Sequence, residues 1–247
     1  MKSLFDIFRV TESYKLPDKI MEALLSDQAE KIIREVAYTM LKNAKRDGIE
    51  FAWIPKGTAC PYCLELASRG WRPANENTVG GGHAEHIHTN CKCQYAVRLD
   101  GKSTVEGYTP KRYADLFDNL QGNTKEEKIN TLRRLMDGKN ALTLEQIEFI
   151  LKLEKNPGEL GGKTPAEWKN FLEELEFKVK PLGRGRLKGM SFEDGGGYRI
   201  RYGGDGYLQY HPEKGSHHGG EYYKIASGRY GKRWYDVKGN RINVTKT

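Results

Sequence analysis

The sequence predicts an α+β protein with a helical N-terminal and middle region, a small metal-stapled Cys/His module, and a basic domain built from one helix and an antiparallel four-stranded sheet. Three observations support this class. Helix-capping signals recur through the middle of the chain, short aromatic and β-branched runs separated by glycines fill its last quarter, and all four cysteines lie between residues 60 and 93. We therefore expect a helical region over 1–50, a zinc-binding module over 51–100, a helical linker region over 101–160, and a basic domain over 161–247.

Size and composition exclude several classes of protein. A chain of 247 residues forms one or two domains. It contains no apolar run approaching the roughly 20 residues that span a bilayer, and its start lacks the apolar stretch and cleavage site of a signal peptide. With 11% aromatic residues, the chain is not expected to be disordered.

The N-terminal half is expected to contain a long helix followed by short elements. Residues 18–47 place apolar side chains at helical spacing, and Gly48 follows as a helix-terminating residue. An extended segment is expected over 51–55. The run LELASRGW predicts a short helix ended by Gly70, and CQYAVRL alternates as a strand does.

Three later helices are predicted from their capping residues. Each begins at a threonine, and Glu or Gln stands three positions later. The signals are Thr124 with Glu127, Thr143 with Gln146, and Thr164 with Pro165 and Glu167. The turn-rich segment NPGELGG at 156–162 is the expected domain boundary.

Four strands are predicted after the last helix, because the period of the apolar residues changes to that of a sheet. The runs are YRIRY at 198–202, YLQYH at 207–211, YYKIA at 222–226 and RWYDV at 233–237. One helix packed on such a sheet would bury a core of modest size.

The spacing of cysteines and histidines predicts a structural zinc site. The motif C-x-x-C is followed by H-x-x-C-x-C, and two such turns can close a tetrahedral Cys/His site. The candidate ligands are Cys60, Cys63, His88, Cys91 and Cys93. Five candidates compete for four places, and reduced cysteines or disulfides remain the alternatives. A catalytic zinc is disfavoured because H-E-x-x-H is absent.

The Cys/His segment also resembles a known family. The stretches TACPYCLELASRGW, HIHTNCKCQYAV and STVEGYTPKRYADLFDN are similar to the minor capsid, or head morphogenesis, proteins of tailed phages. This resemblance implies that the five candidates above are metal positions and that the partners are portal and capsid proteins. It also implies a location in the virion head, and in the host cytoplasm during assembly. No membrane partner is expected, because no apolar run is long enough to span a bilayer.

The positive charge of the chain is concentrated at its C-terminal end. Residues 178–247 contain 15 Lys and Arg against 6 Asp and Glu, whereas the remainder contains 26 and 27. An anionic partner is therefore expected, with nucleic acid, either RNA or packaged DNA, as the first candidate. The predicted phosphate contacts are Arg184, Arg186, Lys188, Arg229 and Arg233. A merely solubilising basic face is the alternative.

A catalytic interpretation of the same domain is also open. Histidine can act as a general acid or base, and a cation can stabilise the charge that develops when the 2′-hydroxyl of RNA attacks phosphorus, without a metal. The candidates are His217, His218, Glu221, Lys232 and Tyr235. The predicted architecture loosely resembles the barnase/EndoU/colicin group of ribonuclease toxins. Structural virion protein, toxin-like ribonuclease and nucleic-acid-binding module are thus the competing functions.

Overall fold

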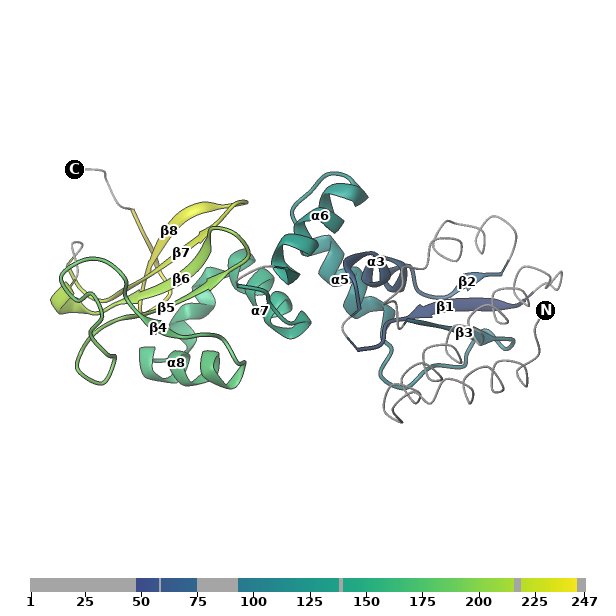
Figure 1. Ribbon diagram of the computed structural model, residues 1–247, viewed down its shortest axis with the longest axis horizontal. Coiled ribbons are helices and arrows are strands. Elements are labelled where there is room, and N and C mark those ends of the chain that lie inside the picture. The colour runs from purple at the N-terminus through teal and green to yellow at the C-terminus, as the bar shows by residue number, and fades with distance from the viewer. Residues whose placement is uncertain (1–47, 58, 75–92, 138–139, 216–218, 244–247) are drawn as a thin grey trace, which may run out of the picture. The chain divides into compact units, whose positions relative to one another are not determined.

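The computed structural model describes residues 48–57, 59–74, 93–137, 140–215 and 219–243 (Figure 1). The chain divides into two compact units, Met1–Ala114 and Asp115–Thr247. Within the described residues, the combination of helices with antiparallel sheets confirms the α+β class. The helix predicted over 18–47 lies outside these residues. No described helix is both long and apolar enough to cross a bilayer.

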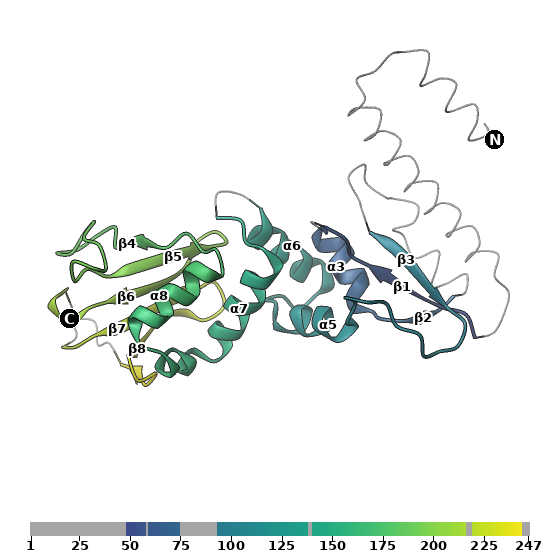
Figure 2. The ribbon, with the colours of Figure 1, turned by 90° about the horizontal axis from the view of Figure 1, so that it is seen from below.

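The first unit contains a three-stranded antiparallel sheet. Its central strand β1 (Glu50–Ile54) lies between β2 (Arg72–Pro73) and β3 (Gln94–Arg98), as Figure 2 shows. The β1–β3 register places Ile54 opposite Gln94. Both the extended segment at 51–55 and the strand in CQYAVRL are therefore confirmed.

Helix α3 (Pro61–Ser68) packs against this sheet and presents Cys60 at its N-cap. The helix ends before Gly70, whose φ of +66° is a conformation that glycine adopts readily. The Tyr108 hydroxyl donates a hydrogen bond of 2.8 Å to the carbonyl of Ala67. The segment that follows β3 is thus tied to α3.

The second unit begins within a helical region and ends in a sheet. Its helices are α5 (Pro110–Asn119, which crosses the unit boundary), α6 (Lys125–Met136), α7 (Leu144–Lys155), a 3₁₀ turn (Pro157–Gly162) and α8 (Pro165–Glu174). All three predicted capping boxes are present, with threonine and its Glu or Gln partner exchanging hydrogen bonds. The local sequence therefore sets where these helices begin.

The sheet of the second unit is antiparallel and follows chain order from β4 to β9. Its strands are β4 (Lys180–Pro181), β5 (Tyr198–Tyr202), β6 (Gly206–His211), β7 (Tyr222–Ser227), β8 (Gly231–Asp236) and β9 (Arg241–Ile242). The four predicted strands correspond to β5–β8. The two edge strands are two residues long, which is too short to show a period of two in the sequence.

Helices α7 and α8 cover one face of this sheet, which we call the inner face; Figure 2 shows α8 lying against it. The Tyr198 hydroxyl donates to the carbonyl of Pro165, the first residue of α8, at 3.0 Å. From β8, the Arg233 guanidinium donates to the Glu154 carbonyl of α7 at 2.9 Å. A row of tyrosines and a row of aliphatic residues fill the space beneath the helices.

The boundary expected at 156–162 is not where the chain divides, because the second unit already begins at Asp115. Leu160 in this segment is fully buried, and its carbonyl accepts a 2.8 Å hydrogen bond from the indole of Trp168. The segment is a 3₁₀ turn packed within the second unit. The turn-rich composition marks the break between α7 and α8.

Candidate nucleic-acid interface and metal centre

The sheet face opposite α7 and α8, which we call the outer face, carries most of the cationic side chains of β5–β8 and three of their aromatic side chains, Tyr207, Tyr222 and Trp234. Side chains alternate along each strand, so the register alone assigns them to this face. They are Arg199, Arg201, Tyr207, Gln209, His211, Tyr222, Lys224, Ala226, Lys232, Trp234 and Asp236.

Lys224 lies at the centre of the outer face. Its Nζ is 5.6 Å from the ring centroid of Tyr207 on β6 and 5.6 Å from that of Trp234 on β8. Partial burial lowers the pKa of Lys224, because it disfavours the charged form. The face therefore combines a cation with two aromatic rings, which is the chemistry that binds both phosphates and unstacked bases.

One end of the outer face is hollowed. A depression of about 430 Å³ is lined by Arg201, Tyr207, Ala226 and Lys232 together with the turns that join the strands. Burial raises the pKa of Tyr207, while the positive charges of Lys232 and Arg201 oppose that rise. The Tyr207 hydroxyl therefore lies within the electrostatic reach of both cations, which line the same depression.

A histidine lies on the same face. The rings of His211 and Tyr222 stack with centroids 4.6 Å apart and planes 5° apart, and the His211 Nε2 is 3.2 Å from the Gln209 Oε1. By register, Gln209 is opposite Lys224. A titratable imidazole and a lysine with a lowered pKa thus belong to neighbouring positions of one surface.

The structure does not gather the described members of the predicted catalytic set. Glu221 precedes β7, whereas Lys232 is opposite Ala226 near the other end of that strand. Five residues of strand separate the two positions, or about 17 Å. Tyr235 is 7% exposed and lies opposite Tyr223 on the inner face. His217 and His218 lie outside the described residues.

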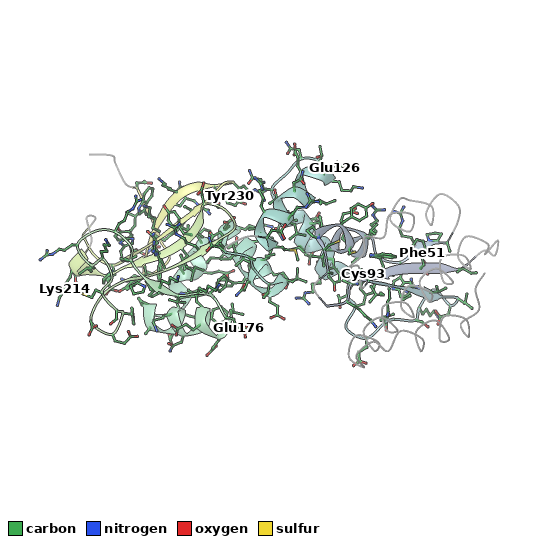
Figure 3. The ribbon with its side chains drawn as sticks, in the orientation of Figure 1. Phe51, Cys93, Glu126, Glu176, Lys214 and Tyr230 are labelled. Carbon is green, nitrogen blue, oxygen red and sulfur yellow. The ribbon has the colours of Figure 1, made fainter. Side chains whose placement is uncertain are left out.

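The predicted phosphate contacts divide into exposed and buried residues. Arg184, Arg186 and Lys188 are exposed on the segment between β4 and β5. Arg229 is exposed at the β7–β8 turn, beside Tyr230, which Figure 3 labels. Arg233 differs from the other four: its residue is 9% exposed, and its guanidinium donates to the Glu154 carbonyl of α7 on the inner face.

Sequence reasoning did not single out Arg199, Arg201 and Lys224, which the register places on the outer face. The signal was available in YRIRY, where aromatic and aliphatic residues alternate with arginines. Such alternation predicts that one face of the strand is buried and the other is cationic. The alternation within one strand does not show which residues of the neighbouring strands lie on the same face. That requires the register between the strands.

The geometry of the cysteine pair suits a metal. The Sγ atoms of Cys60 and Cys63 are 3.4 Å apart, and the amide of Cys63 donates to the Cys60 Sγ at 3.4 Å. Two thiolates bound to one tetrahedral zinc at about 2.3 Å would be about 3.8 Å apart. The N-terminal turn of α3 thus brings both sulfurs close to the separation that a shared ion requires.

Cys93, which Figure 3 labels, is buried and immediately precedes β3. Its neighbour Gln94 is opposite Ile54, from which the chain runs on to Cys60. The described residues alone do not bring three or more Cys, His, Asp or Glu side chains into a metal-binding group. His88 and Cys91 lie outside the described residues, so the full candidate set remains a prediction.

Comparisons with known proteins bear on the first unit. No curated protein and no solved structure matches the chain. Residues 6–120 match the family model described as VG15 protein, which is a phage-associated viral gene family. The matched segment contains the Cys/His segment and α3. Over these residues, the chain is related to a phage-associated family.

Proposed function

We propose that this chain is a minor component of a phage head and that its second unit binds single-stranded nucleic acid on the outer face of the sheet. The observation that carries the binding proposal is the gathering of cations and aromatic rings on one sheet face, while α7 and α8 occupy the other. Cations neutralise phosphates, and aromatic rings stack on bases that are not paired. A duplex keeps its bases stacked inside, so a single strand is the better fit.

Fluorescence anisotropy with a labelled single-stranded oligonucleotide tests this proposal. The double variant Arg201→Ala/Lys232→Ala removes the two cations that flank the depression. We expect weaker binding and a shallower dependence of log affinity on log salt, by about 0.7 for each phosphate that the variant no longer neutralises. The matched control is Lys152→Ala, which removes an exposed cation on α7. Equal effects of the two changes would contradict the proposal.

A metal-independent ribonuclease is the second candidate function, favoured by the presence of His211 and Lys224 on one face. In such a reaction a base takes the proton of the 2′-hydroxyl, the 2′-oxygen attacks phosphorus, and the 5′-oxygen leaves with a proton from an acid. Neutral imidazole or amine can serve as the base, and a cation can stabilise the phosphorane-like state.

Labelled RNA incubated with the full chain, with and without chelator, separates cleavage from binding. Cleavage that survives chelator and is lost in His211→Ala would assign the reaction to the outer face. Loss in His217→Ala or His218→Ala instead would assign it to the predicted histidine pair. An inert protein would remove the ribonuclease candidate and leave the binding proposal intact.

For the first unit, we propose a structural zinc held by four of Cys60, Cys63, His88, Cys91 and Cys93. Such an ion would supply folding energy to a segment poor in apolar residues. Elemental analysis of the purified chain should find about one zinc, and Cys60→Ser should reduce that content. The head role, with portal and capsid proteins as partners, predicts that mass spectrometry detects the chain in purified virions.

A further inference from the structure

A second cavity of the second unit lies between α6, α7 and the turns at the ends of the strands. Its volume is about 270 Å³, and its mouth is lined by the exposed residues Arg134, Asp205 and Arg229. Its apolar wall includes Leu135, Ile150 and Leu151. The residues Gly204–Gly206 and Ser227–Gly228 line this cavity and also the depression on the outer face. The cavity and the depression on the outer face therefore share one wall, but the remaining residues that line them are different.

A buried carboxyl group lies in this cavity. Glu154 is 7% exposed near the C-terminal end of α7. Burial raises the pKa of Glu154, while the neighbouring Tyr202 hydroxyl, the charge of Arg233, the Ser227 hydroxyl and the charge of Arg229 oppose the rise. The Tyr202 hydroxyl donates its single proton to the Ala226 carbonyl at 3.2 Å. A carboxylate accepts about four hydrogen bonds, so the Ser227 hydroxyl leaves it capacity for a pair of further donors.

The rim of the cavity offers cationic donors. The Arg134 guanidinium donates to the Thr131 Oγ1 at 3.0 Å, and the Arg229 guanidinium donates to the Asn119 carbonyl at 3.1 Å. Each guanidinium carries five N–H donors, so both keep donors for an anionic group at the mouth.

These features specify the chemical groups that a ligand of this cavity must carry. It must present two neighbouring N–H donors to Glu154, a flat apolar body to the aliphatic wall, and an anionic group to Arg134 and Arg229. A guanidinium ligand also offers paired donors, but its positive charge would lie among Arg134, Arg229 and Arg233. A neutral ring avoids this repulsion. The volume is slightly below the roughly 300 Å³ at which pockets for drug-sized ligands begin, so it suits one ring system.

We propose that this cavity binds a phosphorylated guanine nucleoside. The N1–H and exocyclic N2–H of guanine donate to the two oxygens of Glu154, and the phosphate is held by Arg134 and Arg229 at the mouth. Adenine presents an acceptor at N1 and would face the carboxylate unfavourably. This site is distinct from the outer face, so its failure would leave the nucleic-acid proposal standing.

Calorimetric titration of the full chain with GMP and with AMP tests the proposal. We expect saturable GMP binding that is at least tenfold tighter than AMP binding. Glu154→Gln replaces one acceptor by an NH₂ donor and should reduce GMP affinity to that for AMP, whereas Lys152→Ala should not change it. Arg134→Ala, at the exposed rim, should weaken GMP but not guanosine. Thermal unfolding of each variant checks that it is folded.

Two further titrations identify the source of the nucleotide. An oligonucleotide with a 5′-terminal guanosine phosphate that competes with GMP would identify a strand end as the ligand, whereas failure to compete would identify the free nucleotide. Absence of GMP binding, or equal binding of GMP and AMP in the parent chain and in folded Glu154→Gln, would overturn the proposal.

Discussion

Replacement of Arg233 by alanine should destabilise the second unit strongly, because this arginine connects β8 to the end of α7. Its guanidinium donates at 2.9 Å to the carbonyl of Glu154, and this carbonyl belongs to the last turn of α7, where no intrahelical donor remains. The guanidinium carbon is also 4.5 Å from the ring centroid of Tyr230. The residue is 9% exposed, so water replaces these contacts poorly.

The expected magnitude follows from these contacts. A hydrogen bond from a charged donor contributes about 1.5–3 kcal/mol, and a partly buried cation–π contact adds about 1 kcal/mol. The Arg233 Nε has no hydrogen-bond partner among the described residues, and this desolvated donor offsets part of the gain. We therefore expect Arg233→Ala to lower the free energy of unfolding by about 3 kcal/mol.

Urea unfolding followed by circular dichroism measures this change. Arg186→Ala is the matched control, since Arg186 is exposed and its loss should change stability by less than about 0.5 kcal/mol. Arg233→Lys should lie between the parent and Arg233→Ala, because it keeps the charge but loses the planar fork. A loss below about 0.5 kcal/mol in Arg233→Ala would refute the structural role assigned to this residue.

Three other predictions concern stability and its dependence on pH. The pKa of Glu154 is raised in the folded state, so protonation of this carboxyl stabilises the fold. This contribution to the free energy of unfolding is fully present below the ordinary pKa of 4.5 and is lost as the pH rises through the pKa of Glu154 in the folded state. Glu154→Gln should abolish that pH dependence; an unchanged slope in urea titrations would contradict it. Thr164→Ala removes the cap of α8 and should cost about 1 kcal/mol, whereas no loss in urea unfolding would argue against the capping box. Leu172→Ala, at a fully buried position of α8, should cost about 2–5 kcal/mol by the same assay; a cost below about 1 kcal/mol would contradict its place in the core.

The sequence determined the helix starts, the strands and the cysteine pair, because each depends on interactions between residues that are close along the chain. Thr124, Thr143 and Thr164 begin helices because a capping side chain bonds to a backbone amide three residues away. The aromatic and β-branched runs became β5–β8 for an equally local reason. The turn of α3 likewise brings Cys60 and Cys63 together, since two intervening residues fix their separation.

Only the tertiary structure decided which side chains share a surface. The run RWYDV alternates whichever face is buried, and the register of Arg233 opposite Ile225 sends this arginine beneath α7 and leaves Trp234 with Lys224 on the outer face. Glu154 resembles any surface glutamate in the sequence until β8 and the turns enclose it. The physical reason is that burial and electrostatic environment depend on segments distant along the chain, and no local pattern encodes their approach.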